Sequence, residues 1–463
     1  MGKVKAFLNK FFRIEERGST ITRELIGGLI IFLAMFYILP VNSFMVGGSG
    51  IDGATVGGVF FATAVSAAVA TLIMGLLANF PVALAPGMGV NAFFTYTVCL
   101  TLGYSYPQAL VCVLVSGVLF LIISLTKLRK IVLDAVPKNL KYAIGAGIGF
   151  FITYVGLKNA GIVVPDDSTY TTLGNLANPT VLLAVFGVIL VLVLHNISEK
   201  TRKFAVIIAM LVTGLLGVIL GACGVPNMPT LNGGQISDGS DFFTGFGAFV
   251  SGFDVLAKPE AYAVIFSFLF VDFFDTAGTL VAVGTEAKLV DENGNLIEDR
   301  KALLADSIGT VVGSVLGTPT VTSYIESTTG IASGARTGLS ATVVGILFLL
   351  SLLIYPALGM FGSVMIGEVS YSPVTSLALI YVGTLMFGQV KNIDWKDTIA
   401  IASTFLVLIL MLLCNSISDG IVFGVIFYTI MMLAAKRRKE VHWIMYVLCA
   451  LFVVYLIVKF LAL

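Results

Sequence analysis

The sequence predicts an all-α polytopic membrane protein of about fourteen transmembrane segments, arranged as two inverted repeats of seven. Of its 463 residues, 58% are hydrophobic and only 11% are charged, whereas about a quarter of the residues in a soluble domain are charged. The mean hydropathy is +1.02. Apolar runs of roughly 20 residues, the length that a helix needs to cross a bilayer, follow one another along the chain. The polar stretch Pro226–Gly252 divides them into two groups, and no stretch is long enough for a separate soluble domain.

The individual spans follow from these runs. In the first half they are predicted near residues 24–46, 52–78, 81–97, 106–126, 142–163, 180–198 and 203–222. In the second half they are predicted near residues 260–283, 302–317, 320–335, 338–358, 372–390, 397–414 and 418–435. A further apolar run at 442–463 is either a fifteenth crossing or an interfacial helix.

The distribution of basic residues predicts the orientation. Basic clusters follow the fourth, sixth and fourteenth spans, at Lys127–Lys130, Lys200–Lys203 and Lys436–Lys439. If the N-terminus is cytoplasmic, all three clusters and the charged loop Asp291–Lys301 lie on the cytoplasmic side, while the acidic pair Asp166–Asp167 lies outside. Short cytoplasmic loops of membrane proteins are enriched in lysine and arginine. We therefore expect a multi-pass protein of the cell membrane with a cytoplasmic N-terminus.

Seven spans on either side of the connector mean that corresponding spans enter the membrane from opposite faces, as in inverted-repeat transporters. The third place in each half is taken by a short segment that contains proline and glycine, Pro81–Tyr96 and Gly317–Arg336. Extended backbone at membrane depth is tolerated only where protein or a water-filled cavity satisfies its polar groups. We expect binding residues at these two breaks. The alternative is a pair of proline-kinked helices without a special role.

Three carboxylates stand out in or beside segments that are otherwise predicted to be buried in the membrane. Asp272 and Asp275 belong to Ala263–Val283, and Glu326 belongs to the second broken segment. A carboxylate at the centre of a bilayer costs about 3 kcal/mol or more, so its retention indicates a function. If the two halves face each other, Asp275 and Glu326 can line one pocket and accept N–H donors of a polar ring, or carry a proton. Asp272 has a strong alternative role, in which it pairs with a neighbouring hydroxyl or caps a backbone group.

Other polar and aromatic residues could complete such a pocket. Asn91 offers a donor and an acceptor, although it could instead be the N-cap of a half-helix. Phe273 and Tyr324 could stack on a planar ring, although aromatic residues are more often packing residues. The cysteines have no metal-type spacing, and no nucleotide-binding or hydrolase motif is present. We expect no metal, no cofactor and no nucleic-acid partner.

Three runs resemble one known family: Pro81–Phe94, Phe270–Leu280 and Gly317–Ser340. They are similar to the AzgA-like adenine/guanine/hypoxanthine permeases, which belong to the nucleobase–cation symporter group with the uracil and xanthine permeases. The resemblance extends over essentially the whole chain. It implies a fourteen-span fold with a core and a gate, in which the third and tenth spans are each part strand and part helix.

The resemblance also implies a domain organisation. Spans one to four and eight to eleven would form the core and the others the gate, and proteins of this fold often dimerise through the gate, which is compatible with a homodimer. The expected boundaries are core 1–126 and 259–360, gate 127–225 and 361–440, and extracellular connector 226–258, with 441–463 as an additional helix.

The resemblance also implies roles for individual residues of this sequence. Asp275 takes the place of the substrate-binding acid of the eighth span, and Thr279 stands where uracil permeases have a histidine. Glu326 corresponds to the tenth-span residue that holds the base, and the backbone or ring of Tyr324 would line the site. Asn91 matches a polar third-span residue associated with purine binding. For the coupled proton, the first choice is Asp275 and the second is Asp272, while Glu326 is also a candidate.

The sequence therefore predicts a proton-coupled importer of purine nucleobases that works by alternating access and is not an enzyme. The nearest rival is the same architecture with uracil, xanthine or an inorganic anion as substrate. A remote rival is an intramembrane enzyme that uses the carboxylates as a catalytic pair. A channel is disfavoured because no ring of identical pore-lining groups is evident. Sodium coupling stays open.

Overall fold

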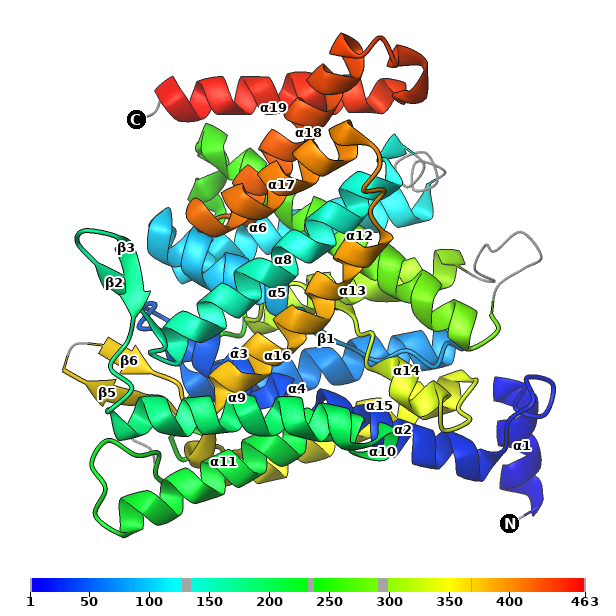
Figure 1. Ribbon diagram of the computed structural model, residues 1–463. Helices are drawn as coiled ribbons and strands as arrows, with labels where there is room; N and C mark the ends of the chain where they lie inside the picture. Colours follow the sequence, from blue (N-terminus) through cyan, green and yellow to red (C-terminus); the bar gives the residue numbers. More distant parts are fainter. Residues whose placement is uncertain (1, 127–134, 232–236, 290–298, 368, 462–463) are drawn as a thin grey trace.

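The computed structural model describes residues 2–126, 135–231, 237–289, 299–367 and 369–461 (Figure 1). Within these residues, nine helices are long and apolar enough to cross a membrane. The protein is thus a mostly helical polytopic membrane protein, and the count of about fourteen crossings stays a prediction. The basic cluster Lys127–Lys130 lies outside the described residues, as does most of the loop Asp291–Lys301.

The first half of the chain contains helices that follow the predicted spans closely. In order, they and the intervening strands are α1 (Gly2–Phe12), α2 (Ile21–Met35), α3 (Ile38–Asn42), the π-helix η1 (Ser43–Gly47), α4 (Val56–Ile73), the π-helix η2 (Met74–Ala78), β1 (Leu84–Pro86), α5 (Met88–Ala92), the π-helix η3 (Phe93–Thr101), α6 (Tyr106–Leu125), α8 (Lys138–Asn159), β2 (Val163–Asp166), β3 (Tyr170–Leu173), α9 (Pro179–Ile197), α10 (Glu199–Arg202) and α11 (Ala205–Ala222).

The second half begins with a short helix in the predicted connector. Its elements are the 3₁₀-helix η4 (Ala248–Ala257), α12 (Pro259–Glu286), α13 (Asp299–Leu316), β4 (Val321–Ser323), α14 (Ser327–Ile331), α15 (Gly338–Leu350), the 3₁₀-helix η5 (Ser351–Phe361), β5 (Val364–Ile366), β6 (Val369–Tyr371), α16 (Thr375–Phe387), the 3₁₀-helix η6 (Gly388–Asn392), α17 (Thr398–Leu413), α18 (Ile417–Ala434), the 3₁₀-helix η7 (Arg438–Glu440) and α19 (Trp443–Leu461).

Local sequence explains where many of these helices begin and end. Thr20, Thr55 and Ser105 precede α2, α4 and α6, and each side-chain oxygen accepts a hydrogen bond from a backbone N–H of the first turn. Such caps satisfy N–H groups that have no partner inside the helix. At the opposite ends, Asn79 closes η2 and Gly103 follows η3, both with positive φ. This left-handed backbone favours asparagine and glycine.

The two ends of the molecule are formed by different secondary-structure elements. Figure 1 shows the hairpins β2–β3 and β5–β6 at one end and α1 near the other. The acidic residue Asp166 closes strand β2, so it lies far from the N-terminal helix. This separation agrees with the predicted placement of Asp166 and the N-terminus on opposite sides of the membrane. Which side is cytoplasmic stays a prediction.

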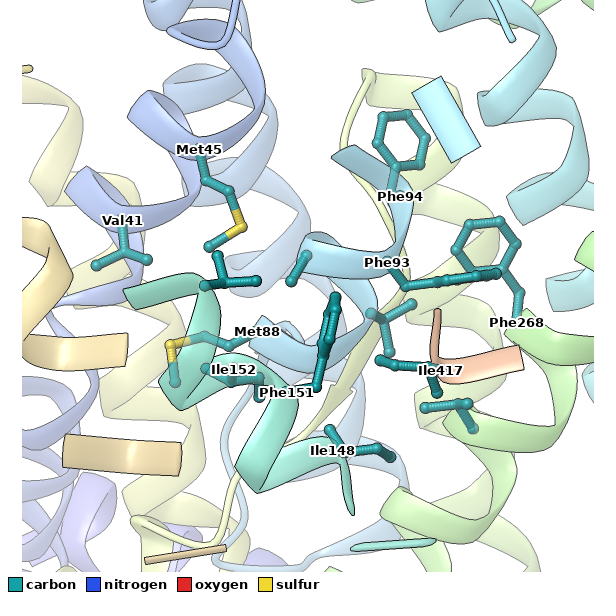
Figure 2. Packing of buried hydrophobic residues seen from close by; sticks show 14 of the residues in the cluster. Val41, Met45, Met88, Phe93, Phe94, Ile148, Phe151, Ile152, Phe268 and Ile417 are labelled. Atoms are coloured by element: carbon teal, nitrogen blue, oxygen red, sulfur yellow. The ribbon is translucent and has the colours of Figure 1, made fainter. Parts of the chain in front are cut away.

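The hydrophobic core joins the broken segment that contains α5 to helices from both halves of the chain. Figure 2 shows Met88 and Phe93 among Ile148 and Ile152 of α8 and Phe268 of α12. The Phe93 and Phe268 rings meet at 4.9 Å and 64°. Such edge-to-face pairs stabilise beyond the area they bury.

The C-terminal helix α19 packs along α18 and α12. Phe452 of α19 is 6% exposed, and its ring meets that of Phe266 in α12 at 5.2 Å and 79°. The last apolar run is therefore a helix docked on the bundle.

Candidate functional site

The two broken segments meet through their strands. β1 and β4 pair antiparallel, with Leu84 opposite Ser323 and Pro86 opposite Val321. Backbone hydrogen bonds extend the pairing on both sides, from Gly87 N to Thr320 O and from Tyr324 N to Ala83 O, both 3.0 Å. The expected strands are confirmed, and the alternative of two merely kinked helices is wrong. Extended backbone inside the bundle satisfies its polar groups here by pairing with the other half of the chain.

Close approach of the strands requires a small residue after β1. A Cβ atom added at Gly87 would lie 2.5 Å from the Thr322 methyl group, which is closer than real side chains come. Glycine at this position lets β1 lie against β4 before the chain turns into α5. The pairing therefore places the start of α5 beside the segment that leads to Glu326.

Glu326 is the N-cap residue of α14 and is separated from the end of β4 by Tyr324 and Ile325. Its Oε1 atom accepts a hydrogen bond from the Tyr37 hydroxyl at 2.6 Å, and its side chain is partly exposed. Tyr37 is 1% exposed and sits between α2 and α3. Sequence reasoning missed Tyr37. The available signal was a phenol in an apolar run just before Pro40, but nothing local indicates a partner almost 290 residues away.

Asp275 of α12 faces the same region. Its carboxylate is close enough for the charge of Glu326 to act on it, and it is only partly buried. Among the described residues, no side chain donates a hydrogen bond to Asp275. The acid thus keeps its acceptor capacity free for a ligand. The structure brings Asp275 and Glu326 together as predicted, but both belong to the second half of the chain, so the expectation of a pair formed across two opposed halves is wrong.

Asn91 is the most unusual member of the site. It lies inside α5, whose N-cap is Gly87, so the alternative role of Asn91 as an N-cap is wrong. The side chain is 0% exposed, and neither its Nδ2 nor its Oδ1 atom has a hydrogen-bond partner within the described residues. The hydroxyl of Thr95, one turn later, also has no partner in the part of the chain that the structure describes. A buried polar group left without a partner costs about 1–3 kcal/mol, which a bound ligand would relieve.

The other predicted site residues have different surroundings. The Tyr324 hydroxyl donates to Pro86 O at 2.5 Å, so this side chain ties β4 to β1. Thr279 lies one turn beyond Asp275 and is half-buried. Phe273 is 2% exposed and packs edge-to-face on Phe120, with ring centroids 5.4 Å apart. Because Phe120 packs against the Phe273 ring, this ring is not available to stack on a substrate.

A fourth carboxylate, Asp306 of α13, lies beside β4 and was missed by sequence reasoning. It is 0% exposed and accepts hydrogen bonds from Thr276 and Ser323, both 2.8 Å. Asp272 is 1% exposed, and its Oδ2 atom lies within hydrogen-bond distance of the Thr310 hydroxyl, at 2.9 Å. The predicted alternative of hydroxyl pairing by Asp272 is therefore confirmed. Within the described ranges, no group of three or more His, Cys, Asp or Glu side chains is arranged to hold a metal ion.

Similarity to known proteins fits this geometry. Residues 22–423 match the model of the family described as "Permease family". The chain belongs to this family. The permease is 43% identical over 456 residues to the guanine/hypoxanthine permease PbuG of Bacillus subtilis, which covers 97% of this chain and 99% of that protein. It is 35% identical over 457 residues to the adenine permease AdeP of Escherichia coli, which covers 97% and 96%.

Among solved structures, the permease resembles the transmembrane domain of the cyanobacterial bicarbonate transporter BicA. The TM-score is 0.62, with coverage of 87% of this chain and 97% of that domain. Sequence identity is 16%, so this likeness concerns the fold alone. The permease is thus a transporter with the general helical arrangement of that domain. The predicted family is confirmed, and the rival of an intramembrane enzyme is not supported.

Proposed function

We propose that the permease imports purine nucleobases, namely guanine, hypoxanthine or adenine, across the cell membrane in symport with protons. The observation that carries the proposal is Asn91, a fully buried amide whose two polar atoms have no partner among the described residues. Its helix α5 follows β1, whose partner strand β4 leads to the partly exposed Glu326, and α12 contains the partly exposed Asp275. A purine ring presents N–H donors and ring-nitrogen acceptors in one plane. Asp275 and Glu326 would accept hydrogen bonds from the N–H groups of the purine. Asn91 would hydrogen-bond to an edge of the ring that presents both a donor and an acceptor. Half-buried Thr279 would border the same pocket.

Relatives support the choice of substrate over the rivals. PbuG is a guanine/hypoxanthine permease and AdeP is an adenine permease, and each matches nearly the full chain. A carrier of inorganic anions would be expected to place helix N-termini or basic groups at its site. Acceptor-only carboxylates at the site favour a ligand that donates hydrogen bonds.

The antiparallel β1–β4 pair supports the finer architecture that we propose. It joins the third segment of one half to the third segment of the other, as expected for seven-plus-seven inverted repeats of fourteen spans. In this proposal, core 1–126 and 259–360 moves against gate 127–225 and 361–440, and the site opens alternately to each side. The N-terminus would be cytoplasmic, and a homodimer would form through the gate.

Binding and uptake of labelled adenine, guanine and hypoxanthine test the proposal. Glu326→Gln and Asp275→Asn should each abolish or strongly weaken binding, because an amide replaces an acceptor oxygen with a donor. Asp397→Asn is the matched control, since this acid lies at the start of α17, far along the chain from the strand pair. Normal transport by both site variants would show that the site assignment is wrong. Failure of the wild-type protein to bind any purine would overturn the function itself.

A further inference from the structure

A group of polar side chains beside strand β4 is sealed from solvent and contains two acids. Asp272 and Asp306 are 1% and 0% exposed. Within the described residues, the side-chain donors to their carboxyl oxygens are neutral hydroxyls, and no ion pair with lysine, arginine or histidine reaches either acid. Buried charges are normally paired or neutralised. The hydrogen-bond partners of each carboxyl group indicate which acid is charged and which is neutral.

Asp306 is fully supplied with donors as a carboxylate. Ser323 donates to Oδ1 and Thr276 donates to Oδ2, both at 2.8 Å. The Thr276 oxygen lies 2.8 Å from that of Thr322, which can donate to it in turn. Each hydroxyl therefore gives its single hydrogen to one acceptor. This arrangement suits a charged Asp306.

Asp272 is one hydrogen short as a carboxylate. The Thr310 oxygen lies 2.9 Å from Asp272 Oδ2 and also 2.9 Å from the Val321 carbonyl oxygen of β4. A threonine hydroxyl has one hydrogen and cannot donate to both acceptors. The other carboxyl oxygen, Asp272 Oδ1, has no hydrogen-bond partner in the described part of the chain. A proton on Oδ2 resolves the conflict, because Asp272 then donates to Thr310, and Thr310 donates to Val321 O.

The charges around Asp272 lead to the same assignment. Asp306 on α13 and Asp275 on the same helix act on it electrostatically. Helix α6, which packs on α12 and α13, contains no Asp, Glu, Lys, Arg or His, and β4 contributes only Val321, Thr322 and Ser323. Like charges in a buried site do not both stay ionised, and one proton is held between them. One proton for Asp272 and Asp306 therefore satisfies both the charges and the hydrogen bonds.

We propose that the coupled proton of the transport cycle is carried by Asp272, with Asp306 as its charged partner, and that Asp275 is left to bind purine. This inference rests on the proposed proton-coupled purine import, and it reverses the order of the two acids expected from the sequence. The proton binds to Oδ2 of Asp272 from one side of the membrane and leaves to the other, with no other bond made or broken.

Loss of the proton from Asp272 would alter the purine site through strand β4. The Thr310 hydroxyl would turn its hydrogen to the carboxylate of Asp272, and the Val321 carbonyl would lose its donor. Ser323, which donates to Asp306, and Glu326 follow Val321 along the same segment. Asp272 and Asp306 are thus positioning residues for β4, and they need not touch the purine.

The test uses the full-length protein, purified and reconstituted in proteoliposomes, with hypoxanthine, guanine and adenine as a panel. For one proton per purine, a gradient of one pH unit supports about tenfold accumulation. Asp272→Asn should bind purine and exchange it across the membrane, yet show no accumulation in response to pH, because its amide N–H permanently replaces the proton. Asp275→Asn should instead lose binding. Asp272→Glu keeps an acid at this position and should retain part of the pH-driven accumulation. This second variant keeps the test decisive even when Asp272→Asn folds poorly.

Each outcome decides the question. Accumulation by Asp272→Asn in response to a pH gradient would overturn the proposal, as would an Asp275→Asn protein that binds purine but has lost coupling. Accumulation by the wild-type protein that follows a sodium gradient at constant pH would replace the proton by sodium and also overturn it. Absence of purine binding by the wild-type protein would instead refute the proposed function. Substrate-induced alkalinisation outside the vesicles, present in the wild-type protein and absent in Asp272→Asn, would support the assignment.

Discussion

At the scale of single residues, two buried asparagines have contrasting roles. Asn42 is 0% exposed, and its Nδ2 donates to Thr63 at 2.7 Å and to Thr318 at 2.9 Å, which links the two halves of the chain. Asn91 is equally buried, yet neither of its amide atoms has a partner in the described residues. A hydrogen-bonded side chain stabilises the fold, whereas an unpaired one is available to a ligand.

This contrast predicts opposite effects of alanine at the two positions. Asn91→Ala should weaken purine binding and leave the thermal stability of the purine-free protein nearly unchanged, because no hydrogen bond is lost. Asn42→Ala should lower stability by about 2–3 kcal/mol, because two buried hydroxyls lose their partner. Melting temperature in detergent with and without purine separates the effects. Equal destabilisation by both variants would contradict the ligand role of Asn91.

The site residues show what sequence can predict at this scale. Asp275, Glu326 and Asn91 were predicted because polar residues are conspicuous in apolar segments. Asp306 was missed because it lies near the start of its predicted span, shortly after the charged residues Arg300 and Lys301, where an acid resembles the end of a loop. Whether the Asn91 side chain has hydrogen-bond partners also could not be predicted from the sequence, because the partners would come from distant parts of the chain.

At the scale of secondary structure, helix contact in the proposed gate depends on glycine. A Cβ atom at Gly149 of α8 would lie 2.6 Å from the Gly383 carbonyl oxygen of α16 and 2.7 Å from Phe387 N. Both neighbours are backbone atoms and cannot move aside without separating the helices. The close contact of α8 with α16 therefore excludes a side chain at this position.

Gly149→Ala should accordingly destabilise the protein by about 1–3 kcal/mol through overpacking. Gly388→Ala is the matched control, because nothing lies within 4 Å of a Cβ atom there. The control should be neutral or slightly stabilising, since alanine is favoured over glycine in helices. Thermal unfolding of the two variants in detergent measures the difference. A Gly149→Ala protein as stable as the control would contradict the close contact.

An ion-pair cluster joins the start of α17 to the segment after α18. Arg437 contacts Asp397 at 2.8 Å and Glu440 at 2.7 Å. The hydrogen bond from Arg437 holds the pKa of Glu440 below its usual value, which is about 4.3. A lowered pKa adds stability above pH 4.3 or so, and this stability is lost as the pH falls through the lower value of the folded protein.

Arg437→Ala should therefore melt slightly below the wild-type protein at pH 6, and the difference should shrink as the pH is lowered below about 4. The effect should be small because the pair is exposed and salt screens it. Melting temperatures at several pH values and two salt concentrations provide the measurement. A difference that grows toward acid pH would have the wrong sign for this cluster.

Sequence predicts elements of this protein better than it predicts their partners. Apolar length located the helices, and Pro and Gly located both breaks, because these signals are local. The presence of strands in the two breaks was implied only by the family resemblance, and the pairing of Leu84–Pro86 with Val321–Ser323 was not predicted. Two strands of three residues have no periodic pattern long enough to be recognised.

At the scale of the whole molecule, side-chain hydrogen bonds cross the proposed boundary between core and gate. They join Asn159 to Tyr96, Thr97 to the Asn415 carbonyl oxygen, and Lys203 to Ser333. Lys203, between α10 and α11, donates to Ser333 after α14 at 3.3 Å. The two residues belong to segments that alternating access would move relative to each other. The contact is therefore expected to break and form again during transport.

Linking Lys203→Cys to Ser333→Cys with a cleavable thiol reagent as long as the lysine side chain should stop purine uptake. Cleavage of the reagent should restore it. The exposed native cysteines, Cys223 and Cys414, are replaced first, and each single variant treated with the same reagent is the control. Undiminished uptake by the linked protein would show that the two segments do not separate during transport.

The β1–β4 pair also has a consequence for biosynthesis. Leu84–Pro86 is made about 235 residues before its partner strand, and at roughly 5–20 residues per second this delay lasts on the order of ten to fifty seconds. During that time the first strand has backbone groups that lipid cannot satisfy. The nascent third segment must therefore wait in the translocon, at the membrane surface or with an insertion chaperone until the tenth emerges. Assembly of the purine site is then among the last steps in making the protein.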